Sequence, residues 1–133
     1  MVTLAELEDL YEVSGWFADE PEIVPPTGEN LLDKESRERL PSLYSGEEQG
    51  LDALAQVKFF TPWSNWTWYG SEYDENDILF GLVIGFEIEM GYFSLSELQQ
   101  VRSPLGLEIE RDLHFEPKSL KELMEMHQRE RRR

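Results

Sequence analysis

Cysteine is absent from the 133-residue sequence, which therefore forms neither a disulfide framework nor a thiolate metal site. Long apolar runs are missing too, because the longest, residues 78–86, is about half of what a membrane helix needs. The first residues do not combine a basic stretch with an apolar one, so we expect no signal peptide. These absences predict a cytoplasmic protein that does not bind membranes.

Positive charge is also scarce. The chain has 12 Lys and Arg residues against 28 Asp and Glu residues, which gives a formal net charge of −16 at pH 7. The first 30 residues contain eight acids and no Lys or Arg. A field of this sign repels phosphate backbones and anionic lipids. It therefore argues against direct nucleic-acid binding and favours a basic protein surface as the partner.

Turn residues and apolar spacing divide the chain into an acidic N-terminal segment, residues 1–30, and a single domain, residues 31–133. A Thr-x-x-Glu capping box begins an amphipathic helix predicted over residues 3–17. Residues 18–30 contain three prolines and a glycine among acids, which predicts a linker.

Helices and strands are both expected within the domain. Helices are predicted over residues 31–40, with Asn30 as the cap, over residues 94–101, and from residue 119 onward. Strands are predicted over residues 57–61, 66–69, 78–86 and 107–115, with a further strand ending at residues 92–93. This order predicts an α+β fold, with an antiparallel sheet of four or five strands, helices packed on one face, and the N-terminal helix in addition.

Six stretches carry a family resemblance: LPSLY at 40–44, KFFTP at 58–62, SNWTWY at 64–69, LFGLV at 79–83, GYFSLSEL at 91–98 and IERDLHF at 109–115. Together, over about residues 31–118, they resemble the small bacterial domain-of-unknown-function family numbered twenty-nine fifty-eight. The resemblance implies a protein of the kind often carried on plasmids, phages and integrated elements. It implies no activity, no catalytic residues and no cofactor.

The predicted strand over residues 107–115 has the sharpest local pattern. Because side chains alternate along a strand, four polar residues share one face, opposite an apolar face that also includes Arg111. Those four residues are Glu108, Glu110, Asp112 and His114. They could hold a divalent cation or act as acid and base, but neighbours on one strand face lie roughly 7 Å apart. A solvated outer face, with Arg111 in a structural ion pair, is the favoured interpretation.

The remaining conspicuous residues favour structural roles. Trp66 and Trp68 share a strand face and are expected in the core, with Thr67 and Tyr69 facing outward. Residues 74–77 predict an acidic turn without the spacing of a calcium-binding loop. His127 lies on the apolar stripe of the last helix and is expected to be packed.

The charge therefore leads to one function hypothesis, a non-enzymatic acidic binding protein. In a mobile-element setting its specific form is a DNA mimic, which inhibits or modulates a DNA-handling or host-defence protein of the anti-restriction or anti-CRISPR type. Two alternatives stay open: a small metal-dependent hydrolase or nuclease that uses Glu108, Glu110, Asp112 and His114, and an accessory subunit of a mobile-element complex. The residues expected to contact a basic partner are Glu6, Asp9, Glu12, Asp19, Glu20, Glu22, Glu108, Glu110 and Asp112.

Overall fold

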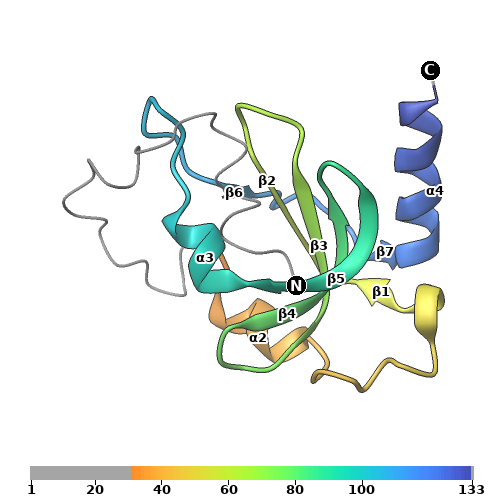
Figure 1. The fold of residues 1–133 in the computed structure, drawn as a ribbon. Coiled ribbons are helices and arrows are strands. Elements are labelled where there is room, and N and C mark those ends of the chain that lie inside the picture. Colours follow the sequence, from red (N-terminus) through yellow and green to blue (C-terminus); the bar gives the residue numbers. More distant parts are fainter. Residues whose placement is uncertain (1–30, 133) are drawn as a thin grey trace.

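A five-stranded antiparallel sheet organises the computed structural model, which describes residues 31–132 (Figure 1). Its strand order is β5-β4-β3-β2-β6, so β5 and β6 are its edges. The strands are β2 (Val57–Phe60), β3 (Thr67–Tyr73), β4 (Ile78–Ile84), β5 (Ile88–Ser94) and β6 (Glu110–Arg111). A second, two-stranded sheet pairs β1 (Leu54–Ala55) with β7 (Lys118–Ser119). The predicted antiparallel sheet is thus confirmed, with five strands.

Tight turns join the central strands into a meander. Between β3 and β4, the carboxylate of Asp74 accepts backbone N–H groups from Asn76, Asp77 and Ile78 at 2.7–2.9 Å, so the predicted acidic turn is confirmed. β4 ends at Ile84, earlier than the sequence predicts, and Phe86 is exposed at the tip of the next hairpin.

Short helices begin where side-chain caps satisfy their free amides. The helices are α2 (Lys34–Arg39), α3 (Leu95–Gln100), α4 (Leu120–Arg131) and the 3-10 turn η1 (Gly50–Asp52). Ser94 caps α3 and Ser119 caps α4, as predicted. The cap of α2 is Asp33, whose side chain accepts the Ser36 N–H, so the helix begins later than the prediction of a cap at Asn30. Leu40, before Pro41, ends it.

The core lies on both faces of the sheet, so the expectation of helices on one face is wrong. One cluster joins α3 and the leucines that flank α2 to the face that carries Trp68, and the other joins α4 to the face that carries Tyr69. Figure 1 shows α4 on the opposite side of the sheet from α2 and α3. Trp66 and Trp68 are buried, as predicted. Thr67 and Tyr69, expected to face outward, are buried as well.

The expected strand over residues 107–115 is also wrong for most of its length. Only β6 pairs with β2, through Phe59 with Arg111 and Phe60 with Glu110. Because β2 has only four residues, it offers a short edge for pairing. Beyond this ladder, Leu113 is 79% exposed, although an apolar strand face would have buried it.

The predicted N-terminal helix and linker lie outside the described residues. Within residues 31–132, no helix combines the length and the apolar character that crossing a bilayer requires.

Candidate functional site: an acidic aromatic pocket

The acids of residues 108–112 do not form a uniform negative surface. Glu108 pairs with Arg102 at 3.2 Å, and Asp112 pairs with Lys58 at 3.7 Å. Glu110 is exposed. Two of these three candidate partner-binding carboxylates therefore have a positive neighbour of their own, which reduces their attraction for a basic partner. The other candidates, Glu6, Asp9, Glu12, Asp19, Glu20 and Glu22, lie outside the described residues.

The structure does not bring Glu108, Glu110, Asp112 and His114 together as a metal site. Within residues 31–132, no group of three or more His, Cys, Asp or Glu side chains could hold a metal ion. Asp112 and His114 follow the end of β6, where the Asp112 carboxylate accepts the His114 backbone N–H at 2.9 Å in a turn. The strand alternation on which the metal hypothesis depended is therefore missing at these two positions.

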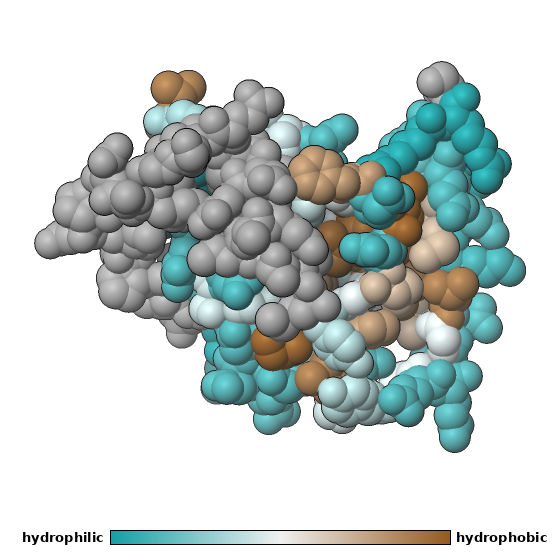
Figure 2. Space-filling model, viewed as in Figure 1, coloured by the Kyte–Doolittle hydropathy of each residue, from teal (hydrophilic) through white to brown (hydrophobic). Residues whose placement is uncertain are grey.

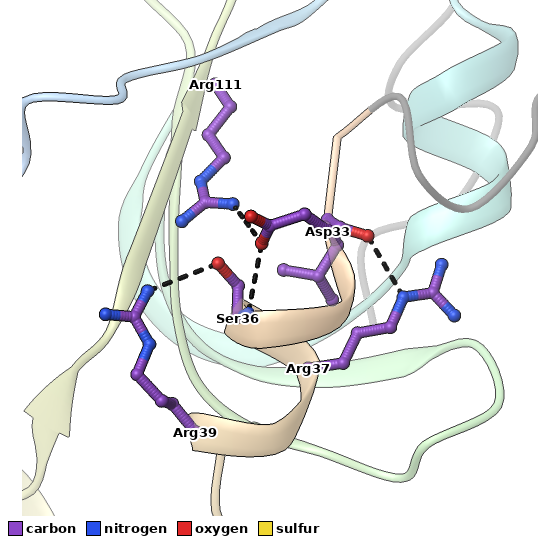
Figure 3. Close-up of polar contacts among 6 residues, drawn as sticks. Asp33, Ser36, Arg37, Arg39 and Arg111 are labelled. Carbon is purple, nitrogen blue, oxygen red and sulfur yellow. Dashed lines mark hydrogen bonds and ion pairs between the residues drawn. The ribbon is translucent and has the colours of Figure 1, made fainter.

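Arg111 forms the structural ion pair predicted for it. Its guanidinium lies 3.1 Å from the carboxylate of Asp33, which also caps α2 by accepting the Ser36 N–H at 3.0 Å (Figure 3). These hydrogen bonds, above all those from Ser36, lower the pKa of Asp33 to about 2. The pair ties the start of α2 to β6 and leaves the Arg111 side chain mostly covered.

His127 is packed, as predicted, on the face of the sheet under α4. Its Nε2 atom lies 2.7 Å from the hydroxyl of Tyr69, and the two rings are 5.6 Å apart. Burial lowers the pKa of His127, although the nearby Glu130 carboxylate opposes this effect. The arrangement stabilises the contact between α4 and β3.

A different feature has the size and composition of a binding site. A pocket of about 370 Å³ lies between the loop before η1 and strands β3, β4 and β5, at the small end of the range of roughly 300–1,000 Å³ in which ligand sites fall. On the face that Figure 2 shows, apolar residues gather beside η1 and α4 with hydrophilic residues around them. The pocket is lined by Tyr44, Gly46, Glu47, Gly50, Leu51, Ala53, Glu72, Phe80, Met90 and Tyr92.

A β-bulge places the carboxylate of Glu72 in this pocket. The register between β3 and β4 shifts between Gly70 and Glu72, so Glu72 lies opposite Phe80 and Tyr73 lies opposite Leu79. The Ser71 hydroxyl donates to the Phe80 carbonyl at 3.1 Å and holds the bulge. Without the extra residue, the alternation of side chains would direct Glu72 toward the Trp68 core.

The loop before η1 closes over this carboxylate. Glu72 accepts the backbone N–H of Tyr44 at 2.6 Å and that of Gly46 at 3.1 Å. A Cβ atom at position 46 would lie 2.6 Å from the Glu72 carboxylate, so glycine permits this close approach. Tyr44 adopts a positive φ of 69°, which is uncommon for a residue with a side chain and marks a conformation held by its surroundings.

Three aromatic rings form one side of the pocket. The Tyr92 ring lies 4.9 Å from Phe80 and 6.2 Å from Tyr44, and both pairs are tilted. Burial raises the pKa of Tyr92, and the neighbouring Tyr44 hydroxyl and the carboxylates of Glu72 and Glu47 raise it further. The three rings and the carboxylates of Glu72 and Glu47 therefore line the same small pocket. No Lys or Arg is among its lining residues.

Sequence reasoning missed this pocket because its residues come from three separate stretches. Tyr44 lies in the first motif of the family resemblance and Tyr92 in a later one, so the motifs themselves were a signal. The bulge had no signal in the sequence, because the alternation of residues 66–73 predicts an unbroken strand.

The fold and the pocket define a small α+β protein whose sheet is covered on both faces and opens into an acidic, ligand-sized pocket. The model of a family described as "Protein of unknown function (DUF2958)" matches residues 31–130, and the chain belongs to this family. The match begins just before α2 and extends through most of α4. No curated protein and no solved structure matches the chain significantly.

Proposed function

We propose that this protein is a non-enzymatic binding protein that engages a basic protein partner through its acidic surface. The observation that carries the proposal is the excess of acids in the segment of the chain from which the pocket is built. Residues 40–101 contain ten acids and one base, Lys58, which already pairs with Asp112. The exposed acids Glu47, Glu48 and Asp52 lie on or next to the loop that closes over Glu72.

A surface of this kind attracts a basic partner over a long range. Screening reduces that attraction beyond about 8 Å at physiological salt, so the effect falls mainly on the association rate. The finer form of the proposal is a DNA mimic, in which carboxylates occupy the positions that phosphates take in the groove of a nuclease, restriction enzyme or CRISPR effector. Such a groove is built to neutralise negative charge and receives a matching acidic array in the same way.

The first experiment identifies the partner by affinity capture from the host and mass spectrometry. The purified partner is then loaded with labelled DNA, and this protein is titrated in. A mimic releases the DNA, and its association rate falls steeply between low and physiological salt. If the partner binds both molecules at once with unchanged affinities, the mimic proposal is wrong and an accessory role in a shared complex replaces it.

Two matched variants locate the contact surface. One carries Glu47→Gln, Glu48→Gln and Asp52→Asn, and the other carries Glu6→Gln, Asp9→Asn and Glu12→Gln. Each removes three charges, so a general effect of net charge slows association equally in both. We expect unequal effects that identify the surface facing the partner. Circular dichroism checks that both variants keep the fold. If neither variant slows association, the acidic surface does not steer binding.

A further inference from the structure

The pocket between the loop before η1 and strands β3, β4 and β5 has walls suited to one particular group. We propose that it is the anchor site for an arginine side chain of the basic partner. This inference rests on the proposed function and deepens it, because it names the group that the acidic surface recognises.

The aromatic walls are the first reason. The faces of aromatic rings carry negative partial charge and attract cations placed over them. Tyr92 is the central ring, with Phe80 at 4.9 Å and Tyr44 at 6.2 Å. Tyr44 is 60% exposed, so this side of the pocket is open to an entering group. A planar guanidinium stacks on such rings, whereas a compact, strongly hydrated ammonium is less suited to them.

The carboxylates are the second reason. Glu72 is only 5% exposed, and it accepts hydrogen bonds from two neutral backbone N–H groups, those of Tyr44 and Gly46. Two carboxylate oxygens offer about four lone-pair positions, so part of the accepting capacity of Glu72 remains for a ligand. Glu47 adds a second, exposed carboxylate at the rim. A guanidinium has five N–H donors in a fork that matches such oxygens.

The remaining wall fits the stem of the same side chain. Leu51, Ala53 and Met90 provide an apolar surface, along which an arginine buries its methylene groups while its head stays polar. A bare divalent cation fits poorly, because calcium takes about 6–8 oxygen ligands and this pocket supplies two carboxylates. The composition of all three walls therefore favours one long cationic side chain.

Methionine methyl groups allow a direct test in the full chain. The protein is labelled at its methionine methyl carbons and titrated with N-acetyl-arginine amide, followed by NMR. Met90 lines the pocket, whereas Met124 and Met126 lie on α4 and serve as internal controls. We expect a saturable shift of the Met90 signal and little change at Met124 and Met126. The citrulline analogue, which is neutral and nearly the same shape, should cause no saturable shift.

Two single substitutions separate the pocket from the general charge of the protein. Glu47→Gln should weaken binding of the arginine probe about threefold, the order expected for losing one partly exposed ion pair. Glu89→Gln removes the same charge from β5, at a position whose side chain alternates to the other face of the strand from Met90 and Tyr92, and should leave binding unchanged. Tyr92→Leu should abolish saturation, whereas Tyr92→Phe, which keeps the ring, should retain it.

Several outcomes overturn the proposal. They are the absence of a saturable Met90 shift, an equal shift with the citrulline analogue, and equal weakening by Glu47→Gln and Glu89→Gln. These results do not depend on the partner, so they leave the capture and DNA-release experiments to decide the proposed function separately. Conversely, a saturable shift that requires Tyr92 and Glu47 supports the arginine site even if DNA release fails.

Discussion

Glu72→Gln is the substitution that tests most directly how this protein builds its pocket. The wild-type carboxylate accepts two backbone N–H groups, from Tyr44 at 2.6 Å and from Gly46 at 3.1 Å. The side-chain carbonyl oxygen of glutamine can still accept one of these backbone N–H groups. Its amide nitrogen is itself a donor and would face the other N–H group. One hydrogen bond to a charged group is thus lost, and such bonds contribute roughly 1.5–3 kcal/mol each.

The expected decrease in the free energy of unfolding is about 2 kcal/mol. It stays below the full penalty of a buried unpaired donor because the loop is partly exposed and can shift. In urea this corresponds to an unfolding midpoint lowered by roughly 1 M, because the free energy of unfolding of a small protein typically falls by about 1–3 kcal/mol per M of urea. Hydrogen exchange at the Tyr44 and Gly46 amides should quicken more than exchange in β4.

Glu48→Gln is the matched control, because it removes the same charge from an exposed position on the same loop. Surface substitutions of this kind usually change stability by no more than about 0.5 kcal/mol. If Glu72→Gln is no more destabilising than Glu48→Gln, and the two amides exchange as in the wild type, then the carboxylate does not hold the loop. The loop would then be held over the pocket by contacts other than those of Glu72.

Three further predictions concern the core and its boundaries. Trp68→Ala should lower the free energy of unfolding by roughly 3–5 kcal/mol in denaturant melts, because the side chain is fully buried in the cluster that joins α3 to the sheet; a loss under about 1 kcal/mol would contradict this. A chain beginning at Asn30 should still unfold cooperatively on heating, because residues 31–132 contain two buried clusters; a broad melt would refute that. Burial lowers the pKa of His127, so the unfolded chain binds its proton more readily and the folded state loses stability as pH falls below about 6.5. His127→Phe should remove that part of the pH dependence in urea melts, and an unchanged pH profile would count against it.

The sequence by itself determined the features that depend on neighbouring residues. The serine caps at Ser94 and Ser119 and the Asp74 turn are satisfied within a few residues of their own position, so their patterns sufficed. The alternation that puts Trp66 and Trp68 in the core is equally local. The composition alone also established the charge of −16 and, with it, the kind of partner to propose.

Tertiary structure decided what depends on segments far apart in the chain. Whether Tyr69 faces solvent depends on α4, some fifty residues later, which covers the second face of the sheet and buries the ring. The length of β6 depends on how much edge β2 offers, and Glu108 and Asp112 are neutralised by Arg102 and Lys58 only once the chain has folded.

The pocket depends on the same kind of long-range geometry. One bulged residue, Ser71, changes the face on which Glu72 lies, and the amides that receive its carboxylate belong to Tyr44 and Gly46, nearly thirty residues away. The sequence pattern of a strand does not reveal such a shift, because a bulge is stabilised by the partner strand and not by the residues beside it. Local patterns thus specified the two serine caps, the Asp74 turn and the buried tryptophans, and contacts between distant segments specified the site.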